Sequence, residues 1–372
     1  MTRFTTAFDK IPLEAFRELP EEVRSEAFFR INELTNAYVD AQARDVLATM
    51  GARALSADVA SSLPAGLASD RVAVWEWLVK KVTRRTDPSS IVNTGELREA
   101  ILTEFLALSP TLDLIDVAAQ GYPDFLRGRR DGNSILFDPA LPNLWEEYFN
   151  NANPLYAAGN TLAGHTVGEE ISARKLASKL NIFEAGAGCG SAARALLDRV
   201  ADRVGCYTLC DISPGFLRKA REGLCRHPAS DSIQFSYKLV DLNRPRERWG
   251  VEPRSFDLVY AVNVLHAVRD LLETLRGLRS LLVDGGVLIL GECVRPARGH
   301  PVHPEFVFQL LKEFRNVVLD PELRPEPGFL DAQSWRASLE RAGFQRVRFV
   351  PDFEAAVAAY PEHTLVTMVA EG

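Results

Sequence analysis

Short apolar runs alternate with helical segments in the second half of the chain, and this alternation restricts the fold more than any other feature. Seven apolar runs predict strands, at Lys179–Glu184, Gly205–Cys210, Ile233–Leu239, Phe256–Val262, Val287–Gly291, Arg346–Val350 and Leu365–Ala370. Amphipathic segments between them predict helices, at Ser191–Asp202, Pro214–Leu224, Val268–Leu282 and Ala332–Ala342. The pattern is typical of an α/β fold with a mostly parallel sheet. No helix follows the last run, so we expect an antiparallel strand near the sheet edge.

The first part of the chain has a different periodicity. From Leu13 to about Ile115, apolar residues recur every three or four positions, which predicts helices. Between Gln120 and Asn143, Gly, Pro and Asp residues favour turns over a continued helix. We therefore predict two parts, a helical lobe at residues 1–150 and an α/β domain at residues 151–372.

Charge and cysteine content narrow the possible partners and the location. The 372 residues include 43 basic and 50 acidic side chains, a net charge of −7, so we expect neither nucleic acid nor a membrane surface as a partner. The five cysteines are odd in number, which favours reduced thiols. The first residues lack the apolar stretch of a signal peptide, and nowhere do 18 apolar residues run together. We expect a cytoplasmic protein that acts on a small molecule.

Three glycines, Gly186, Gly188 and Gly190, lie between the first predicted strand and its helix and follow Glu184. Glycine lets the backbone turn sharply and approach a ligand closely. A glycine-rich turn alone is weak evidence, since a tight turn without a ligand gives the same pattern. The next strand ends at Asp211, 21 positions after Gly190, where a carboxylate can accept the hydroxyl hydrogens of a ribose.

Two carboxylates in this region have structural alternatives. Asp211 could instead cap the helix that begins near Pro214, together with Ser213. The third strand leads to Asp241 and Leu242, a pair suited to an adenine amino group and ring. Asp241 could equally be a turn residue.

This order of features resembles class I S-adenosylmethionine-dependent methyltransferases, from about Tyr156 to Gly372. The resemblance implies a Rossmann-like, seven-stranded α/β sheet and S-adenosyl-L-methionine as the cofactor. It implies cofactor contacts at Tyr156, Asn160, Glu184, Gly186, Gly188, Gly190, Asp211, Ile212, Asp241, Leu242 and Asn263.

The segments AVNVLHAVRDL (Ala261–Leu271) and LLVDGGVLILGE (Leu281–Glu292) resemble polyketide-synthase-type C-methyltransferase domains and stand-alone natural-product methyltransferases. The resemblance implies a catalytic dyad of His266 and Glu292. These residues follow adjacent strands of the expected sheet, so both face the ligand crevice, where a carboxylate would orient the imidazole as a base. The alternative is a structural histidine that caps the following helix.

Two further segments resemble parts of the same enzymes. Glu147–Asn160 resembles an entry segment that closes over the cofactor, with Asn153, Tyr156 and Asn160 as candidates, whereas Tyr148 and Phe149 are expected to be packing residues. An insertion at residues 295–329 is expected to cap the substrate pocket, and a surface helix without substrate contact is the alternative. The lobe at residues 1–150 is expected to supply the acceptor pocket or a lid over it.

No metal site is expected. His300, His303 and Glu305 offer donors, but their spacing lacks a further ligand, and a solvent-exposed or substrate-facing loop is the preferred interpretation. Cys206 and Cys210 lack a second cysteine pair, so zinc is not expected there.

The sequence thus predicts methyl transfer to carbon or oxygen of a small organic acceptor in specialised, polyketide-like metabolism, with the acceptor free or tethered to a carrier protein as a thioester. One alternative is a nicotinamide-dependent oxidoreductase, although the spacing GxGxG differs from GxGxxG and no Tyr-x-x-x-Lys follows. A second alternative is a non-catalytic, cofactor-binding partner protein.

Overall fold

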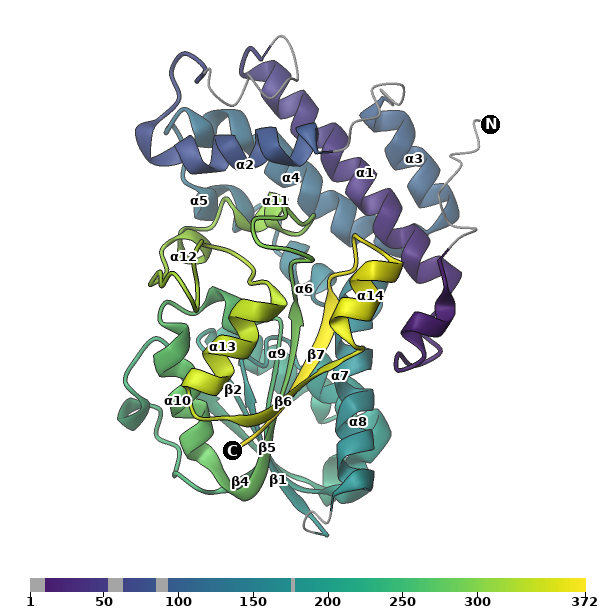
Figure 1. The fold of residues 1–372 in the computed structure, drawn as a ribbon, viewed down its shortest axis with the longest axis vertical. Coiled ribbons are helices and arrows are strands. Elements are labelled where there is room, and N and C mark those ends of the chain that lie inside the picture. The colour runs from purple at the N-terminus through teal and green to yellow at the C-terminus, as the bar shows by residue number, and fades with distance from the viewer. Residues whose placement is uncertain (1–10, 53–62, 85–92, 175–177) are drawn as a thin grey trace.

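A computed structural model describes residues 11–52, 63–84, 93–174 and 178–372. A helical lobe covers one end of a twisted sheet that carries helices on both faces (Figure 1). Within the described residues, every helix is too short or too polar to cross a membrane.

The sheet has seven strands in the order β3-β2-β1-β4-β5-β7-β6. Strands β1 to β5 are parallel neighbours in this order, and β7 is antiparallel to both β5 and β6, which confirms the predicted fold class and the antiparallel last strand. The strands are β1 Leu180–Ala185, β2 Val204–Asp211, β3 Gln234–Leu239, β4 Phe256–Val262, β5 Leu282–Cys293, β6 Gln345–Val350 and β7 Leu365–Glu371. Strand β5 begins five residues before its predicted start at Val287.

Helices cover both faces of this sheet. One face is covered by α7 Pro154–Ala173, α8 Ser191–Val200 and α9 Pro214–Leu224, whose apolar residues share a core with β1 and β2. The other face is covered by α10 Leu271–Leu281 and α13 Ala332–Arg341. The short helix α14 Phe353–Ala359 precedes β7. Ser213, Asp270 and Asp331 cap α9, α10 and α13 by accepting backbone N–H groups, as is favoured at helix starts.

The lobe is built from helices around one apolar core. They are α1 Glu26–Thr49, α2 Val72–Thr83, α3 Thr94–Glu104, α4 Ser109–Leu126, α5 Gly132–Leu136 and α6 Leu144–Tyr148. The prediction of turns from Gln120 onward is wrong at its start, because α4 continues through Gly121 and Pro123 to Leu126. Tyr122 and Phe125 are fully buried there, so tertiary packing overrides the local preference of the Gly and Pro residues.

The segment after β5 crosses from the sheet to the lobe. Its short helices α11 Glu305–Phe308 and α12 Lys312–Arg315 lie between the two parts (Figure 1). Phe306, Val307 and Leu310 join the apolar core of the lobe. Trp77 Nε1 donates a hydrogen bond of 2.9 Å to Glu305 Oε2, so polar contacts also connect this cap to α2.

Residues near the beginning of the described chain pack on the sheet domain. Phe16 and Phe29 share a small core with Leu162 of α7 and Tyr360. In the part of the chain that the structure describes, 3₁₀ helices occur at Leu13–Phe16, Ser69–Arg71, Leu106–Leu108, Ala201–Arg203, Ser230–Ser232, Arg246–Arg248 and Leu265–Ala267.

Candidate active site

A cavity of about 270 Å³ lies where the carboxyl ends of β4 and β5 meet the lobe and the cap. The sheet domain contributes Asn263, Val264, His266, Ala267, Glu292, Cys293, Thr364 and Leu365. The lobe and the start of α7 contribute Phe28, Asn32, Thr111, Ile115, Tyr148, Phe149, Leu155, Tyr156 and Gly159. The cap contributes His303, Pro304, Val307, Phe308, Leu311, Glu313, Phe314 and Phe329. Three parts of the chain that are distant in sequence therefore enclose one space.

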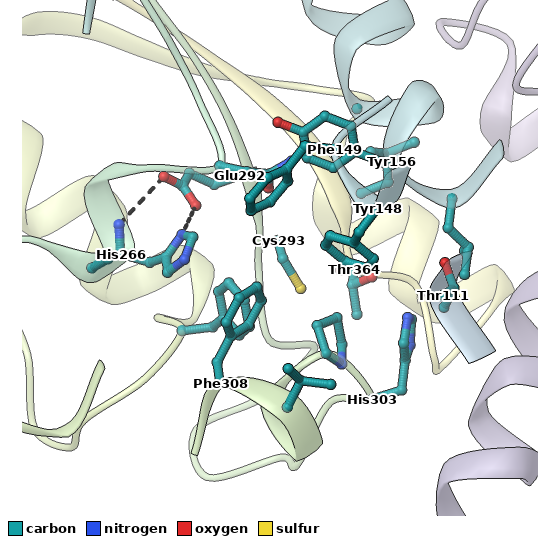
Figure 2. A pocket seen from close by; sticks show the side chains of 18 of the residues that line it. Thr111, Tyr148, Phe149, Tyr156, His266, Glu292, Cys293, His303, Phe308 and Thr364 are labelled. Carbon is teal, nitrogen blue, oxygen red and sulfur yellow. Dashed lines mark hydrogen bonds and ion pairs between the residues drawn. The ribbon is translucent and has the colours of Figure 1, made fainter. Parts of the chain in front are cut away.

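His266 and Glu292 meet at the wall of this cavity, as Figure 2 shows. The distance between His266 Nδ1 and Glu292 Oε2 is 2.6 Å. Glu292 Oε1 accepts backbone N–H groups from Val264 at 3.1 Å, Leu265 at 2.8 Å and His266 at 3.4 Å. The carboxylate thus fixes both the imidazole ring and the loop that carries it. Asp270, not His266, caps α10.

The surroundings of His266 are aromatic. Its ring centroid lies 4.5 Å from Phe329, 5.9 Å from Phe314 and 6.0 Å from Phe308, all in the cap. Arg324 lies behind the histidine, is 2% exposed, and donates to the carbonyl of His266 and, at 2.8 Å, to that of Val268. Burial lowers the pKa of Arg324 to about 10. Since Glu292 occupies Nδ1, the ring nitrogen that remains for a substrate is Nε2.

The glycine turn after β1 requires its glycines. Gly186, Gly188 and Gly190 have φ values of +63°, +52° and +78°, in the left-handed region that side chains disfavour. A Cβ on Gly186 would lie 2.2 Å from Val264 Cγ2, so the turn also packs closely against the loop that leads to His266. A Cβ on Gly188 would meet no atom within 4 Å, so the backbone there is open to a ligand.

Asp211 and Glu184 flank this turn. Asp211 accepts the N–H of Gly188 at 2.9 Å and that of Ser213 at 2.8 Å, whereas the side chain that caps α9 is Ser213. Glu184 accepts the hydroxyl of Tyr207 at 2.9 Å and is 1% exposed. Burial raises the pKa of Asp211, although its backbone hydrogen bonds oppose the shift, and burial raises the pKa of Glu184 to about 8. Asp211 thus holds the glycine turn in place, and each of its oxygens retains a lone pair for a ligand.

The geometry of the residues expected near an adenine points less clearly to a ligand than that of the glycine turn. Ile212 is 63% exposed, an unusual position for an isoleucine, and Leu242 packs partly against the sheet core. Asp241 accepts the N–H of Asn243 at 2.9 Å and pairs with Arg244 at 3.3 Å, the geometry of the turn alternative. The structure therefore places Asp241 beside this region with its carboxylate engaged in a turn.

Asn263, Tyr156 and Asn160 lie between the glycine turn and the cavity. Asn263 directly follows β4 with φ +53°, a strained conformation for a residue with a side chain, and it lines the cavity. Tyr156 also lines the cavity and packs on Phe149 with ring centroids 5.2 Å apart. Asn160 is fully buried and donates to Asn151 Oδ1 at 2.7 Å, while its own Oδ1 has no partner among the described residues.

Two residues of the entry segment have more than one role. Tyr148 and Phe149 pack against the core of the lobe, as expected from the sequence, and they also line the cavity. Asn153 accepts Thr111 Oγ1 at 3.1 Å and so connects the lobe to α7. No signal in the sequence singles out Arg324, which holds the loop of His266.

His303 is buried and lines the side of the cavity opposite His266 (Figure 2). Burial, followed by the charge of Lys81, lowers its pKa to about 3, so the imidazole is neutral at ordinary pH. Across the described ranges, no three His, Cys, Asp or Glu side chains gather in a geometry that could hold a metal ion.

Comparison with known families identifies the class of residues 183–288. Residues 183–288, which include the glycine turn, Asp211 and His266, match the family described as a methyltransferase domain. This part of the chain is a methyltransferase domain. The match confirms the resemblance seen in the sequence and disfavours a nicotinamide-dependent oxidoreductase. S-adenosyl-L-methionine is the cofactor of this class.

Curated relatives of the methyltransferase are large synthases. It is 34% identical over 181 residues to the hybrid PKS-NRPS synthetase lepA of Aspergillus flavus, a match that covers 49% of this chain and 4% of the synthetase. It is 33% identical over 226 residues to the highly reducing polyketide synthase verA of Penicillium polonicum, which covers 60% of this chain and 8% of the synthase. The chain therefore spans only a small part of the length of these relatives.

A solved structure shares the fold over nearly the whole methyltransferase, including its helical lobe. The CurJ carbon methyltransferase is 23% identical with a TM-score of 0.71, and the match covers 96% of this chain and 95% of the other. At this identity the similarity concerns the fold.

The residues present fit the cofactor. The open backbone at Gly188 leaves room for a ligand, and the exposed Ile212 offers an apolar surface to a ring. The unpartnered Oδ1 of Asn160 and the free lone pairs of Asp211 can accept hydrogens from ammonium and hydroxyl groups. Glu184, Asp211 and Asn160 are accordingly the residues that would hold the polar groups of S-adenosyl-L-methionine.

Proposed function

We propose that this methyltransferase methylates a carbon atom of a small, polyketide-like acceptor, with His266 as the general base and Glu292 as its orienting partner. The observation that carries the proposal is the 2.6 Å contact between His266 Nδ1 and Glu292 Oε2 at the cavity wall. An ionised carboxylate favours the tautomer in which Nδ1 carries the proton, so Nε2 presents a lone pair to the acceptor. A non-catalytic binding protein would have no need of this arrangement.

The chemistry follows from these positions. The cofactor, when bound, supplies an electrophilic methyl group on a sulfonium sulfur. His266 Nε2 would take a proton from the acceptor carbon. The electron pair left on that carbon would form the bond to the methyl group while the bond between methyl and sulfur breaks, and the electrons of that bond would remain on the sulfur. Glu292 stabilises the imidazolium that results, and the phenylalanines around the ring exclude water, which strengthens this interaction.

Carbon is favoured over oxygen as the methylated atom. The similar CurJ protein is a carbon methyltransferase, and the curated relatives are polyketide synthases. Polyketide intermediates contain carbon atoms between two carbonyl groups. Removal of a proton from such a carbon leaves an enolate whose negative charge spreads onto the carbonyl oxygens. A neutral imidazole is therefore a sufficient base. We therefore propose a β-ketoacyl thioester as the acceptor.

The lobe and the cap form the acceptor side of the site in this proposal. Residues 1–150 contribute Thr111, Ile115 and Tyr148 to the cavity, and the insertion at residues 295–329 contributes Phe308 and His303. The apolar lining suits an acyl chain, and the neutral His303 can donate or accept a hydrogen bond at a polar group of that chain.

The proposal is tested by locating the transferred methyl group. The protein is incubated with S-adenosyl-L-methionine that carries a ¹³C-methyl group and with a β-ketoacyl N-acetylcysteamine thioester. We expect NMR spectra of the product to show a methyl group bonded to the α-carbon. Transfer to an enol oxygen would reassign the enzyme as an O-methyltransferase, and absence of transfer to this thioester and to matched hydroxyl acceptors would favour a binding protein.

Cofactor affinity should depend on pH through Glu184. Its pKa in the free protein is about 8, and a bound ammonium group would lower it, so binding releases a proton. Affinity for S-adenosylhomocysteine should therefore rise as the pH increases from 6 to 8, by up to about tenfold per unit, and level off above 8. Calorimetry across this range measures the effect.

The matched control is Glu184→Gln, which retains the shape but cannot titrate. Its affinity should vary only with the ligand's own amino group. The raised pKa of Glu184 also affects the stability of the free protein, in the opposite direction to its effect on affinity. The folded protein binds a proton at Glu184 more tightly than the unfolded chain does, because the pKa of this carboxyl is near 4.5 in the unfolded chain. This contribution to stability is therefore lost as the pH rises from about 4.5 to 8. Parallel affinity curves for the two proteins would show that Glu184 does not contact the ligand.

A further inference from the structure

Two arginines on the outer side of the cap share one aromatic ring. The guanidinium carbon of Arg71 lies 4.3 Å from the ring centroid of Phe125, and that of Arg315 lies 5.3 Å from it. Arg71 pairs with Asp70 at 2.7 Å, and this carboxylate is mostly exposed. Among the described residues Arg315 has no carboxylate partner, and its buried Nε has no acceptor.

The positive charge of Arg315 is only partly compensated within the protein. Burial, followed by the charge of Arg71, lowers the pKa of Arg315, and the carboxylates of Asp70 and Glu313 act in the opposite direction without cancelling this shift. A half-buried guanidinium usually has a carboxylate or a phosphate as its partner, because desolvation is otherwise uncompensated. The protein as a whole is acidic, so the local excess of positive charge is not a general property of its surface.

The two arginines line a surface pocket together with Lys312. Asn133 and Asn316 add amide groups to the same pocket. Of its two carboxylates, Asp131 already accepts the N–H of Ser134 at 3.0 Å, and Asp70 is paired with Arg71. Three positive side chains and two amides therefore converge on a space where Arg315 lacks a partner.

The pocket lies behind the wall of the reaction cavity. Along the cap segment, Leu311 and Phe314 face the reaction cavity, whereas Lys312 and Arg315 face the outer pocket. One short segment thus contacts the acceptor space with one side and the cationic pocket with the other. The cations therefore lie on the outer side of the segment whose inner side lines the acceptor space.

We propose that the outer pocket binds the phosphate group of a pantetheine arm that carries the acceptor as a thioester. The inference rests on the proposed function, because it assumes a thioester acceptor. The planar guanidinium groups of Arg71 and Arg315 suit phosphate oxygens, and the thioester end would lie on the cavity side of the cap. The same phosphate chemistry occurs on a carrier protein and in coenzyme A, so the experiment separates these two sources.

Direct binding tests the pocket without reference to catalysis. Calorimetry with pantetheine 4′-phosphate should show binding that weakens as salt increases, whereas pantetheine without phosphate should bind much more weakly. Arg315→Gln and Arg71→Gln should each reduce the affinity by about tenfold. The matched control is Arg129→Gln, which removes an exposed arginine that pairs with Asp124 at 3.5 Å and does not line the pocket. Equal affinities for all variants would overturn the proposal.

Kinetics with three thioesters of the same acyl group identify the source of the phosphate. The carriers are a holo-carrier protein, coenzyme A and N-acetylcysteamine, which has no phosphate. Arg315→Gln should raise KM for a phosphate-containing substrate at least tenfold more than for the N-acetylcysteamine thioester. The carrier whose KM changes is the source. Equal changes for all three would contradict the phosphate site, whereas a wild-type protein that methylates none of them would refute the proposed function and leave the binding result valid.

Thermal stability separates a binding role from a structural role. Because Arg71 and Arg315 repel each other in the free protein, Arg315→Gln should leave the melting temperature unchanged or slightly raised. Pantetheine 4′-phosphate should raise the melting temperature of the wild type more than that of the variant. A clear loss of stability in Arg315→Gln without ligand would instead assign Arg315 to packing on Phe125 and contradict the proposal.

Discussion

His266→Ala is expected to slow the methyl-transfer step by about 10²–10⁴-fold, because the acceptor then loses the base that removes its proton. Cofactor affinity should change little, since the imidazole faces the acceptor side of the cavity and its other nitrogen is held by Glu292. Single-turnover measurement isolates this step, and calorimetry with S-adenosylhomocysteine measures the affinity.

A matched control is His227→Ala, which removes a histidine that pairs with Asp198 at 3.1 Å, far in sequence from the dyad. This variant should transfer methyl groups at the wild-type rate. Near wild-type transfer by His266→Ala would remove the base assignment and leave the 2.6 Å contact with Glu292 as a structural feature.

Glu292→Gln is expected to reduce the transfer step nearly as much as His266→Ala. The sequence alone predicts a milder effect, because an orienting residue acts through the base. The geometry changes this expectation. Oε1 accepts N–H groups from Val264 and Leu265, so the amide oxygen of a glutamine has to occupy that position. Its NH₂ group then faces His266 Nδ1 and donates to it, which moves the imidazole proton to Nε2 and blocks the base.

A double-mutant cycle checks this explanation. The variant that carries both His266→Ala and Glu292→Gln should be scarcely slower than His266→Ala, since no imidazole remains to be oriented. Nitrogen NMR of the histidine ring in Glu292→Gln should show the proton on Nε2. Strictly additive losses, or a wild-type tautomer with a slow transfer step, would mean that the two residues act independently.

The sheet domain could be predicted because local patterns and tertiary structure agree there. Strand β4 and helix α9 have the predicted bounds, and β7 is antiparallel to β5. The register of β4 on β5 pairs Val262 with Gly291, so the residues that follow, Asn263 and Glu292, are brought side by side. Motifs at the ends of parallel strands can be recognised in the sequence, because the topology places those ends along one edge of the sheet.

The segment that caps the cavity could be predicted, but its individual lining residues could not, because they come together only through long-range packing. Phe308, Phe314 and Phe329 have no shared periodicity in the sequence, yet they surround His266. Arg324 lies in a proline-rich stretch and has its partners 56 and 58 positions away. The continuation of α4 past Gln120 likewise depends on the burial of Tyr122 and Phe125 by other elements.

The hydrogen bonds that Arg324 donates to the carbonyls of His266 and Val268 restrict how the cap can move. A hinge motion that lifted this part of the cap would also pull on the loop that holds the base, and the alignment of His266 with Glu292 would be lost. We therefore expect the cap to stay in place over the cavity, unlike the mobile lids that many enzymes close over their substrates. We expect the width of the cavity entrance to select among acceptors before the reaction begins.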